Sequence, residues 1–191
     1  MKYPHWQYYE SILRELETIS RYVEISPYNY STYSTELTKI LLSTGSEIDV
    51  VAKLLCKNTK ITKSPDNIKE YQRILCAKFP GFHDVEISLP KYIISFKPWY
   101  DWLQNKTPEW CICYNKVKHE KDKHFREGNL KNVLFATGGL CVLVSYLYYN
   151  DFISKNLGIM PLFMFLDRKY VSGCKVLTKG NFRLPDFEND G

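Results

Sequence analysis

The sequence of 191 residues predicts a mainly helical, all-α fold: an antiparallel helical bundle with a small β-hairpin insertion and a C-terminal β-hairpin. Apolar residues recur at helical spacing in residues 6–23 and 34–56. Residues 133–149 are almost continuously apolar, a pattern typical of a helix buried on every side. Strand-like alternation is confined to about 83–97 and 160–178. These observations predict a core built from helices.

Length and composition predict one domain of ordinary globular type. Hydrophobic residues make up 45% and charged residues 25% of the chain. We expect residues 1–155 to form the helical domain, with 82–97 as a non-helical insertion. Residues 156–191 would form a C-terminal hairpin and tail that pack on the same domain. The net charge of +5 permits an anionic partner such as RNA but does not demand one.

The cysteines and the N-terminus bear on compartment and metal binding. The six cysteines contain no C-x-x-C pair, and none of the four histidines matches them at zinc-ligand spacing. We therefore expect reduced, mostly buried thiols, no metal site and no cofactor. The N-terminus lacks the apolar run of a signal peptide, so a cytoplasmic location is expected.

The first three helices follow from periodicity and capping signals. Residues 6–23 form the first, Ser34 caps a second that runs to about Cys56, and a third spans about 64–79 before Pro80 and Gly81. On the second helix Asp49 and Lys53 are four residues apart, the spacing of an ion pair, and Glu47 precedes them. A solvated helix face is the simpler interpretation of these three charges.

Two tryptophans follow the insertion. Trp99 and Trp102 are three residues apart in a predicted helical turn. They would cover the core beside Trp110, and a base-stacking platform for nucleic acid is the alternative. Further along, residues 132–149 approach the length of a membrane span. We favour the central helix of the bundle, with no membrane partner, because there is no second span and no basic flank downstream.

The helix that starts at Thr107, Pro108 and Glu109 concentrates the polar chemistry. At about 100° per residue its packing side carries Trp110, Cys113 and Val117, with Tyr114 at the edge. If the helix runs unbroken to residue 126, an amide, an imidazole, a carboxylate and a guanidinium share the opposite side. These residues are Asn115, His119, Asp122 and Arg126, flanked by Lys116 and Lys118.

Several short motifs resemble the HEPN superfamily, and more closely its uncharacterised bacterial members, over roughly residues 10–150. They are Arg21-Tyr22-Val23-Glu24, Glu47-Ile48-Asp49 with Lys53, the pair Trp99 and Trp102, and Tyr114-Asn115-x-Val117-Lys118-His119. The resemblance implies an antiparallel helical bundle, a homodimer, and a metal-independent endoribonuclease of a toxin–antitoxin or antiphage defence system. An antitoxin or defence-system protein would then be a partner.

The family motif is an arginine, a polar residue, three further residues and a histidine. Carried over, His119 matches the histidine and Asn115 the polar residue, whereas Tyr114 stands at the arginine position. Arg126 or Lys118 would then supply the positive charge. We therefore expect His119, Asn115 and Arg126 to be catalytic. The residues expected to bind substrate are Lys118, Lys116, Lys53, Glu47 and Tyr114.

The chemistry implied is RNA cleavage through the 2′-hydroxyl, with imidazole as acid or base. Because one helix offers a single histidine on this face, a two-fold dimer would complete the site. Two alternatives stay open. His119 could be a surface or interface histidine bonded to a carboxylate such as Glu47. The chain as a whole could be a non-catalytic HEPN-like module that binds RNA, a nucleotide or a partner protein.

Overall fold

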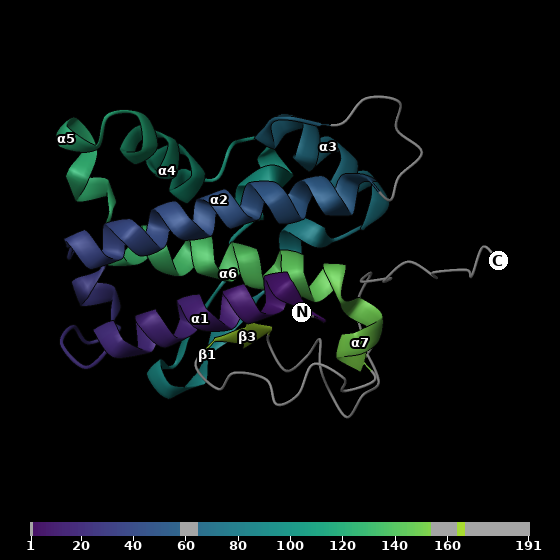
Figure 1. Cartoon of the computed structure of the whole chain (residues 1–191). Coiled ribbons are helices and arrows are strands. Elements are labelled where there is room, and N and C mark those ends of the chain that lie inside the picture. Colours follow the sequence, from purple (N-terminus) through teal and green to yellow (C-terminus); the bar gives the residue numbers. More distant parts are fainter. Residues whose placement is uncertain (1, 58–64, 154–163, 167–191) are drawn as a thin grey trace.

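A computed structural model describes residues 2–57, 65–153 and 164–166 of the chain (Figure 1). Within these ranges the fold is mainly helical, as the sequence predicts. The α-helices are α1 (Pro4–Ile19), α2 (Thr35–Lys57), α3 (Ile68–Lys78), α4 (Glu109–His119), α5 (Lys121–His124), α6 (Leu130–Leu147) and α7 (Tyr149–Ile153). The strands are β1 (Ile87–Leu89), β2 (Ile94–Phe96) and β3 (Phe165–Leu166). Short 3-10 turns include η4 (Tyr100–Gln104) and η5 (Phe125–Glu127).

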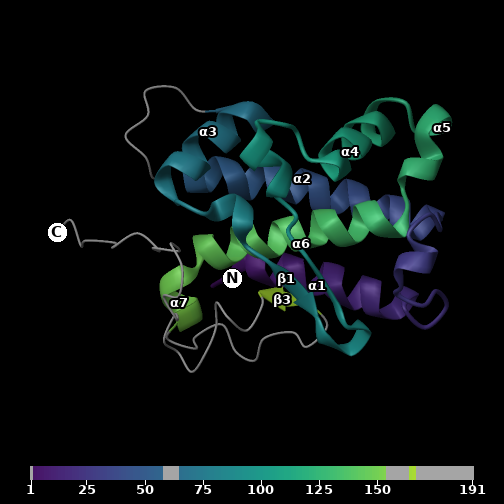
Figure 2. The same ribbon diagram turned by 180° about the vertical axis from the view of Figure 1, so that it is seen from behind.

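Helix α6 is the centre of the molecule. It packs against α1, α2, α4 and the strands β1 and β3, and both views show it between these elements (Figures 1 and 2). It is long and apolar enough to cross a membrane, but 83% of this stretch is buried inside the protein. Because its whole circumference meets other elements, an apolar residue is favoured at nearly every position. The predicted central helix is confirmed.

The first three helices begin and end close to the predicted points. Ser34 caps α2, its hydroxyl oxygen accepting a hydrogen bond from the Leu37 N–H at 3.1 Å. Helix α3 begins at Ile68, later than the predicted start at about residue 64, and is capped by the Asn67 side chain, which accepts bonds from the N–H groups of Lys69 and Glu70. Helix α1 ends at Ile19, not at residue 23, and the chain then turns so that Ile25 is buried.

The predicted insertion is an antiparallel hairpin. Strands β1 and β2 pair in the register Ile87 to Phe96 and Leu89 to Ile94. Strand β3 pairs with the other edge of β1, giving the order β2-β1-β3. The Tyr9 hydroxyl donates a hydrogen bond to the Met164 carbonyl at 3.0 Å, which fixes this segment against α1. The rest of the predicted C-terminal hairpin lies outside the described residues.

The tryptophans of η4 belong to the core. Trp99 is 1% and Trp102 3% exposed, and their ring centroids are 4.3 Å apart. The Trp99 indole N–H donates to the Gly139 carbonyl at 3.2 Å, which ties this turn to α6. The core interpretation is confirmed, and a base-stacking platform at these two rings is excluded by their burial. The five described cysteines are free thiols, as predicted.

The expectation of one helix up to residue 126 is wrong. Helix α4 ends at His119, and Glu120 leaves the helical region with φ −140° and ψ 61°. The chain continues as the four-residue α5 and then η5. The break allows Phe125 to pack edge-on against Tyr33, with ring centroids 5.8 Å apart. The predicted face of Asn115, His119, Asp122 and Arg126 therefore does not exist as one helical surface.

Candidate functional site

Two neighbouring hollows on the surface of α4 contain most of the predicted site. They share Ile68 and Asn115, so we treat them as one feature, the α4 groove. The inner hollow, of about 410 Å³, lies between α2, the start of α3 and α4. The outer hollow, of about 480 Å³, extends along the exposed side of α4 from Thr107 to His119 and reaches His124 on α5. Six of the eight predicted site residues line the groove: Lys53, Tyr114, Asn115, Lys116, Lys118 and His119.

The inner hollow is organised by Asp49. Its carboxylate accepts a hydrogen bond from the Tyr71 hydroxyl at 2.6 Å and another from the Lys53 ammonium at 2.6 Å. Tyr71 is 2% exposed, and burial, followed by the bond to Asp49, raises the pKa of Tyr71 above its ordinary value. The hydroxyl thus remains a protonated donor, and Lys53 is held by a carboxylate.

Tyr114 forms a wall of the inner hollow and does not reach out of it. It is 8% exposed, and its ring lies against the backbone of Gly45 on α2. The Lys118 ammonium lies 5.6 Å from the centre of this ring. Within the described parts of the chain, no carboxylate lies at ion-pair distance from Lys118. Lys118 is therefore a cation available to an anionic ligand.

The outer hollow brings together two histidines. Asn115 and His119 line it, as the sequence suggests, and so does His124 from α5. The His124 imidazole lies 3.7 Å from the Glu120 carboxylate. Lys116, at the same hollow, lies 3.8 Å from Glu127, a distance typical of a loose ion pair. Two imidazoles and an amide thus border one solvent-accessible space.

His124 was missed by sequence reasoning because an unbroken helix points it elsewhere. Five residues of α-helix turn the chain by about 140° relative to the position of His119. The break at Glu120 changes this direction and brings His124 to the hollow that His119 lines. The spacing of five residues between His119 and His124 would have predicted a shared site only if the end of the helix at Glu120 had been recognised in the sequence.

Two predicted residues lie apart from the groove. Arg126, on η5, has its guanidinium 6.0 Å from the ring centre of Tyr33 and is not among the residues that line either hollow. The Glu47 carboxylate and the His5 imidazole form a hydrogen bond of 2.6 Å, which joins α2 to α1. Glu47 is therefore not the carboxylate beside His119, whereas His119 itself is exposed, as a surface histidine would be.

Comparisons with known proteins return no match. No family model matches the chain, and neither does any curated protein or solved structure. The HEPN resemblance thus depends on its short motifs alone. Within residues 2–57, 65–153 and 164–166, no group of three His, Cys, Asp or Glu side chains is placed to hold a metal ion.

Proposed function

We propose that the chain is a metal-independent endoribonuclease that binds RNA along the α4 groove and cleaves it at the outer hollow. The observation that carries this proposal is the presence of His119 and His124 at one hollow, beside Asn115. Imidazoles titrate near neutral pH, so one can accept a proton while the other donates one. A single hollow with two imidazoles meets the minimum for acid–base cleavage of RNA.

The reaction would proceed by attack of the ribose 2′-oxygen on the adjacent phosphorus. One imidazole removes the 2′-hydroxyl proton, and the other, protonated, gives its proton to the departing 5′-oxygen. The products are a 2′,3′-cyclic phosphate and a 5′-hydroxyl. The Asn115 amide and the Lys116 ammonium, at the same hollow, would stabilise charge on the phosphate oxygens.

The inner hollow would hold the adjoining part of the RNA strand. Lys118 is its cation without a carboxylate partner among the described residues, and Lys53 offers a second positive charge that Asp49 offsets. Phosphate contacts from lysines position a strand without reading its sequence. The groove would therefore bind RNA with marked salt dependence.

The assembly and the biological setting remain predictions. The argument that a homodimer must supply a second histidine is weakened, because His124 of the same chain already lines the hollow. A dimer is still expected from the HEPN resemblance, as are a toxin–antitoxin or antiphage role and a protein partner. A cytoplasmic location likewise stays an expectation from the sequence.

A non-catalytic RNA-binding module is the second candidate function. It is favoured by the burial of Tyr114 at the motif's arginine position and by the absence of Arg126 from the residues that line the outer hollow. Without an arginine, the groove could bind phosphate and yet stabilise the transition state too weakly for cleavage. Binding without cleavage would identify this case.

The deciding experiment compares purified wild type with His119→Ala and His124→Ala on a fluorescent single-stranded RNA. We expect each variant to lose cleavage by about 10²–10⁴-fold, the usual contribution of a proton-transfer group. Cleavage should persist in EDTA and leave a cyclic phosphate. Lys121→Ala, an exposed change on α5, is the control and should cut normally. If wild-type protein binds this RNA but does not cut it with or without divalent metal, the binding-module function replaces the nuclease.

A further inference from the structure

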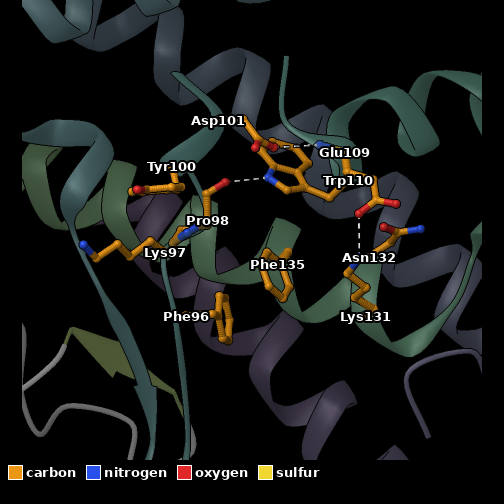
Figure 3. A pocket seen from close by; sticks show the side chains of 10 residues that line it. All are labelled: Phe96, Lys97, Pro98, Tyr100, Asp101, Glu109, Trp110, Lys131, Asn132 and Phe135. Atoms are coloured by element: carbon orange, nitrogen blue, oxygen red, sulfur yellow. Dashed lines mark hydrogen bonds and ion pairs between the residues drawn. The ribbon is translucent and has the colours of Figure 1, made fainter. Parts of the chain in front are cut away.

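A separate cavity lies beside the N-terminal end of α4. It is formed by the chain that follows β2, the first turn of α4 and the first turns of α6, and has a volume of about 550 Å³. We call it the aromatic cavity. Figure 3 shows Lys97 and Tyr100 on one side and Glu109, Asn132 and Lys131 on the other, with Phe135 between them. Its volume is within the range of small-ligand sites.

The floor of the aromatic cavity is apolar and already ordered. Phe96 and Phe135 stack with centroids 4.3 Å apart and planes inclined by 22°. The Trp110 indole N–H donates to the Pro98 carbonyl at 2.9 Å, which fixes the orientation of this ring. Tyr100 is 44% exposed at the rim. A flat ring could therefore bind here without rearrangement of the core.

The rim carries a donor beside an acceptor. The Lys131 ammonium donates to the Glu109 carboxylate at 2.6 Å, and both side chains are partly open to solvent. Asp101 holds this end of α4 by accepting the Glu109 N–H at 3.3 Å. Glu109 is thus fixed through its backbone, while its side chain and that of Lys131 face the solvent side of the cavity.

Asn132 adds an amide to the lining of the cavity. It is 4% exposed, and its amide nitrogen donates to the Glu127 carbonyl at 2.9 Å. No hydrogen bond to its amide oxygen is found among the described residues. The amide of Asn132 thus contributes a polar group to the wall of the cavity.

We infer that the aromatic cavity binds a guanine base. Guanine presents N1–H and the N2 amine next to the O6 acceptor, so the Glu109 carboxylate can accept two bonds while Lys131 donates one. Adenine offers one amine beside one acceptor and would make one bond fewer to the same pair. The partly buried ring of Phe135 and the half-exposed ring of Tyr100 supply the stacking surface that nucleic-acid sites use for unpaired bases.

The base can come from a free mononucleotide or from single-stranded RNA. The same contacts serve both, and the difference lies in whether affinity needs a polynucleotide chain. This inference does not depend on cleavage, because the ligand would be held by residues that the outer hollow does not include.

Calorimetry on the full chain with GMP, IMP and AMP tests the inference, because IMP lacks the N2 amine. We expect GMP to stand first in the order of affinity, at least tenfold tighter than both IMP and AMP, because each of these makes one bond fewer to Glu109 and Lys131. Glu109→Gln should remove this order, since an amide has one acceptor oxygen where the carboxylate has two. Tyr100→Ala, at a half-exposed rim position, should weaken all three ligands about tenfold through lost stacking. Glu15→Gln, on the exposed face of α1, is the matched control and should bind as wild type.

A parallel arm uses the binding of oligoribonucleotides that carry G or A at one position in an otherwise uridine strand. A preference for G that Glu109→Gln abolishes, without measurable GMP binding, assigns the base to RNA. Measurable GMP binding with the expected order assigns it to a free nucleotide. Equal affinity for the purines in both arms, or binding unaffected by Tyr100→Ala, overturns the inference. Circular dichroism and thermal unfolding of each variant exclude loss of fold as the cause.

Discussion

The ring of Tyr114 on α4 lies against the backbone of Gly45 on α2, so closely that a Cβ atom at residue 45 would overlap the ring. The residue at the arginine position of the family motif is therefore part of the packing between two helices. A charged side chain in this place would start from a buried position beside α2, and residue 114 does not line the outer hollow. The tyrosine at residue 114 thus contributes to the contact between α2 and α4.

Gly45→Ala should destabilise the protein. Alanine favours a helix over glycine by about 1 kcal/mol, but overpacking against a fixed ring costs about 1–3 kcal/mol, so a net loss is expected. Urea unfolding measures it. Ser46→Ala, at the exposed neighbouring position, should change stability by less than about 0.5 kcal/mol. A Gly45→Ala protein as stable as wild type would show that Tyr114 can move aside.

Tyr71→Phe should lower stability by about 1–2 kcal/mol, because it removes a partly buried hydrogen bond from the buried Tyr71 side chain to the Asp49 carboxylate. A double-mutant cycle with Asp49→Asn measures the coupling between the two side chains. We expect the two effects to be strongly non-additive. Additive effects would mean that Asp49 is held by Lys53 and solvent alone.

Lys118→Ala should weaken RNA binding and reduce its dependence on salt. Removal of one phosphate contact lowers the slope of log affinity against log salt by about 1. Fluorescence anisotropy at several salt concentrations measures the slope. Lys39→Ala, which removes an exposed lysine paired with Glu36 on α2, is the control and should leave the slope unchanged. An unchanged slope in Lys118→Ala would place the RNA elsewhere on the protein.

Arg126→Ala should leave cleavage within about twofold of wild type. Its guanidinium packs over Tyr33, so we expect instead a loss of stability of about 0.5–1 kcal/mol from the cation–π contact. Single-turnover cleavage and thermal unfolding separate these effects. A large loss of rate with unchanged stability would return Arg126 to the catalytic role that the sequence suggests.

Alkaline pH should destabilise the fold in part through Cys113. Burial, followed by the hydrogen bond to Glu127, raises the pKa of this thiol from 9.0 to about 12. Below pH 9 both folded and unfolded thiols are protonated, and the contribution to stability is fully present. Between pH 9 and about 12 only the unfolded thiol loses its proton, so stability falls as pH rises.

The unfolding free energy of Cys113→Ala should therefore decline less steeply than that of wild type between pH 8.5 and 10.5. The difference between the two slopes corresponds to at most one proton released on unfolding. Urea titrations across that range measure the slope. Glu127→Gln should retain most of the slope, because burial is the larger cause of the shift. The same slope in Cys113→Ala and wild type would assign the alkaline loss to other groups.

The sequence by itself determined the helical class, the central position of residues 132–149 and the two faces of α4. Each feature follows from a local pattern in the sequence. A continuous apolar run predicts the buried central helix, and an apolar stripe at helical spacing with polar residues opposite predicts the two faces of α4. Burial of Trp110, Cys113 and Val117, with Asn115 and His119 exposed, follows directly from that spacing. The insertion hairpin was equally readable from its alternation.

Only the tertiary structure decided where α4 ends and what meets at its end. The break at Glu120 accompanies the packing of Phe125 against Tyr33, residues far apart in the sequence, and no local pattern contains this contact. That packing separates Arg126 from the outer hollow and places His124 there beside His119. Likewise, Glu47 and Asp49 are close in sequence, but His5 binds the first and Tyr71 the second, because contacts with other helices set their surroundings.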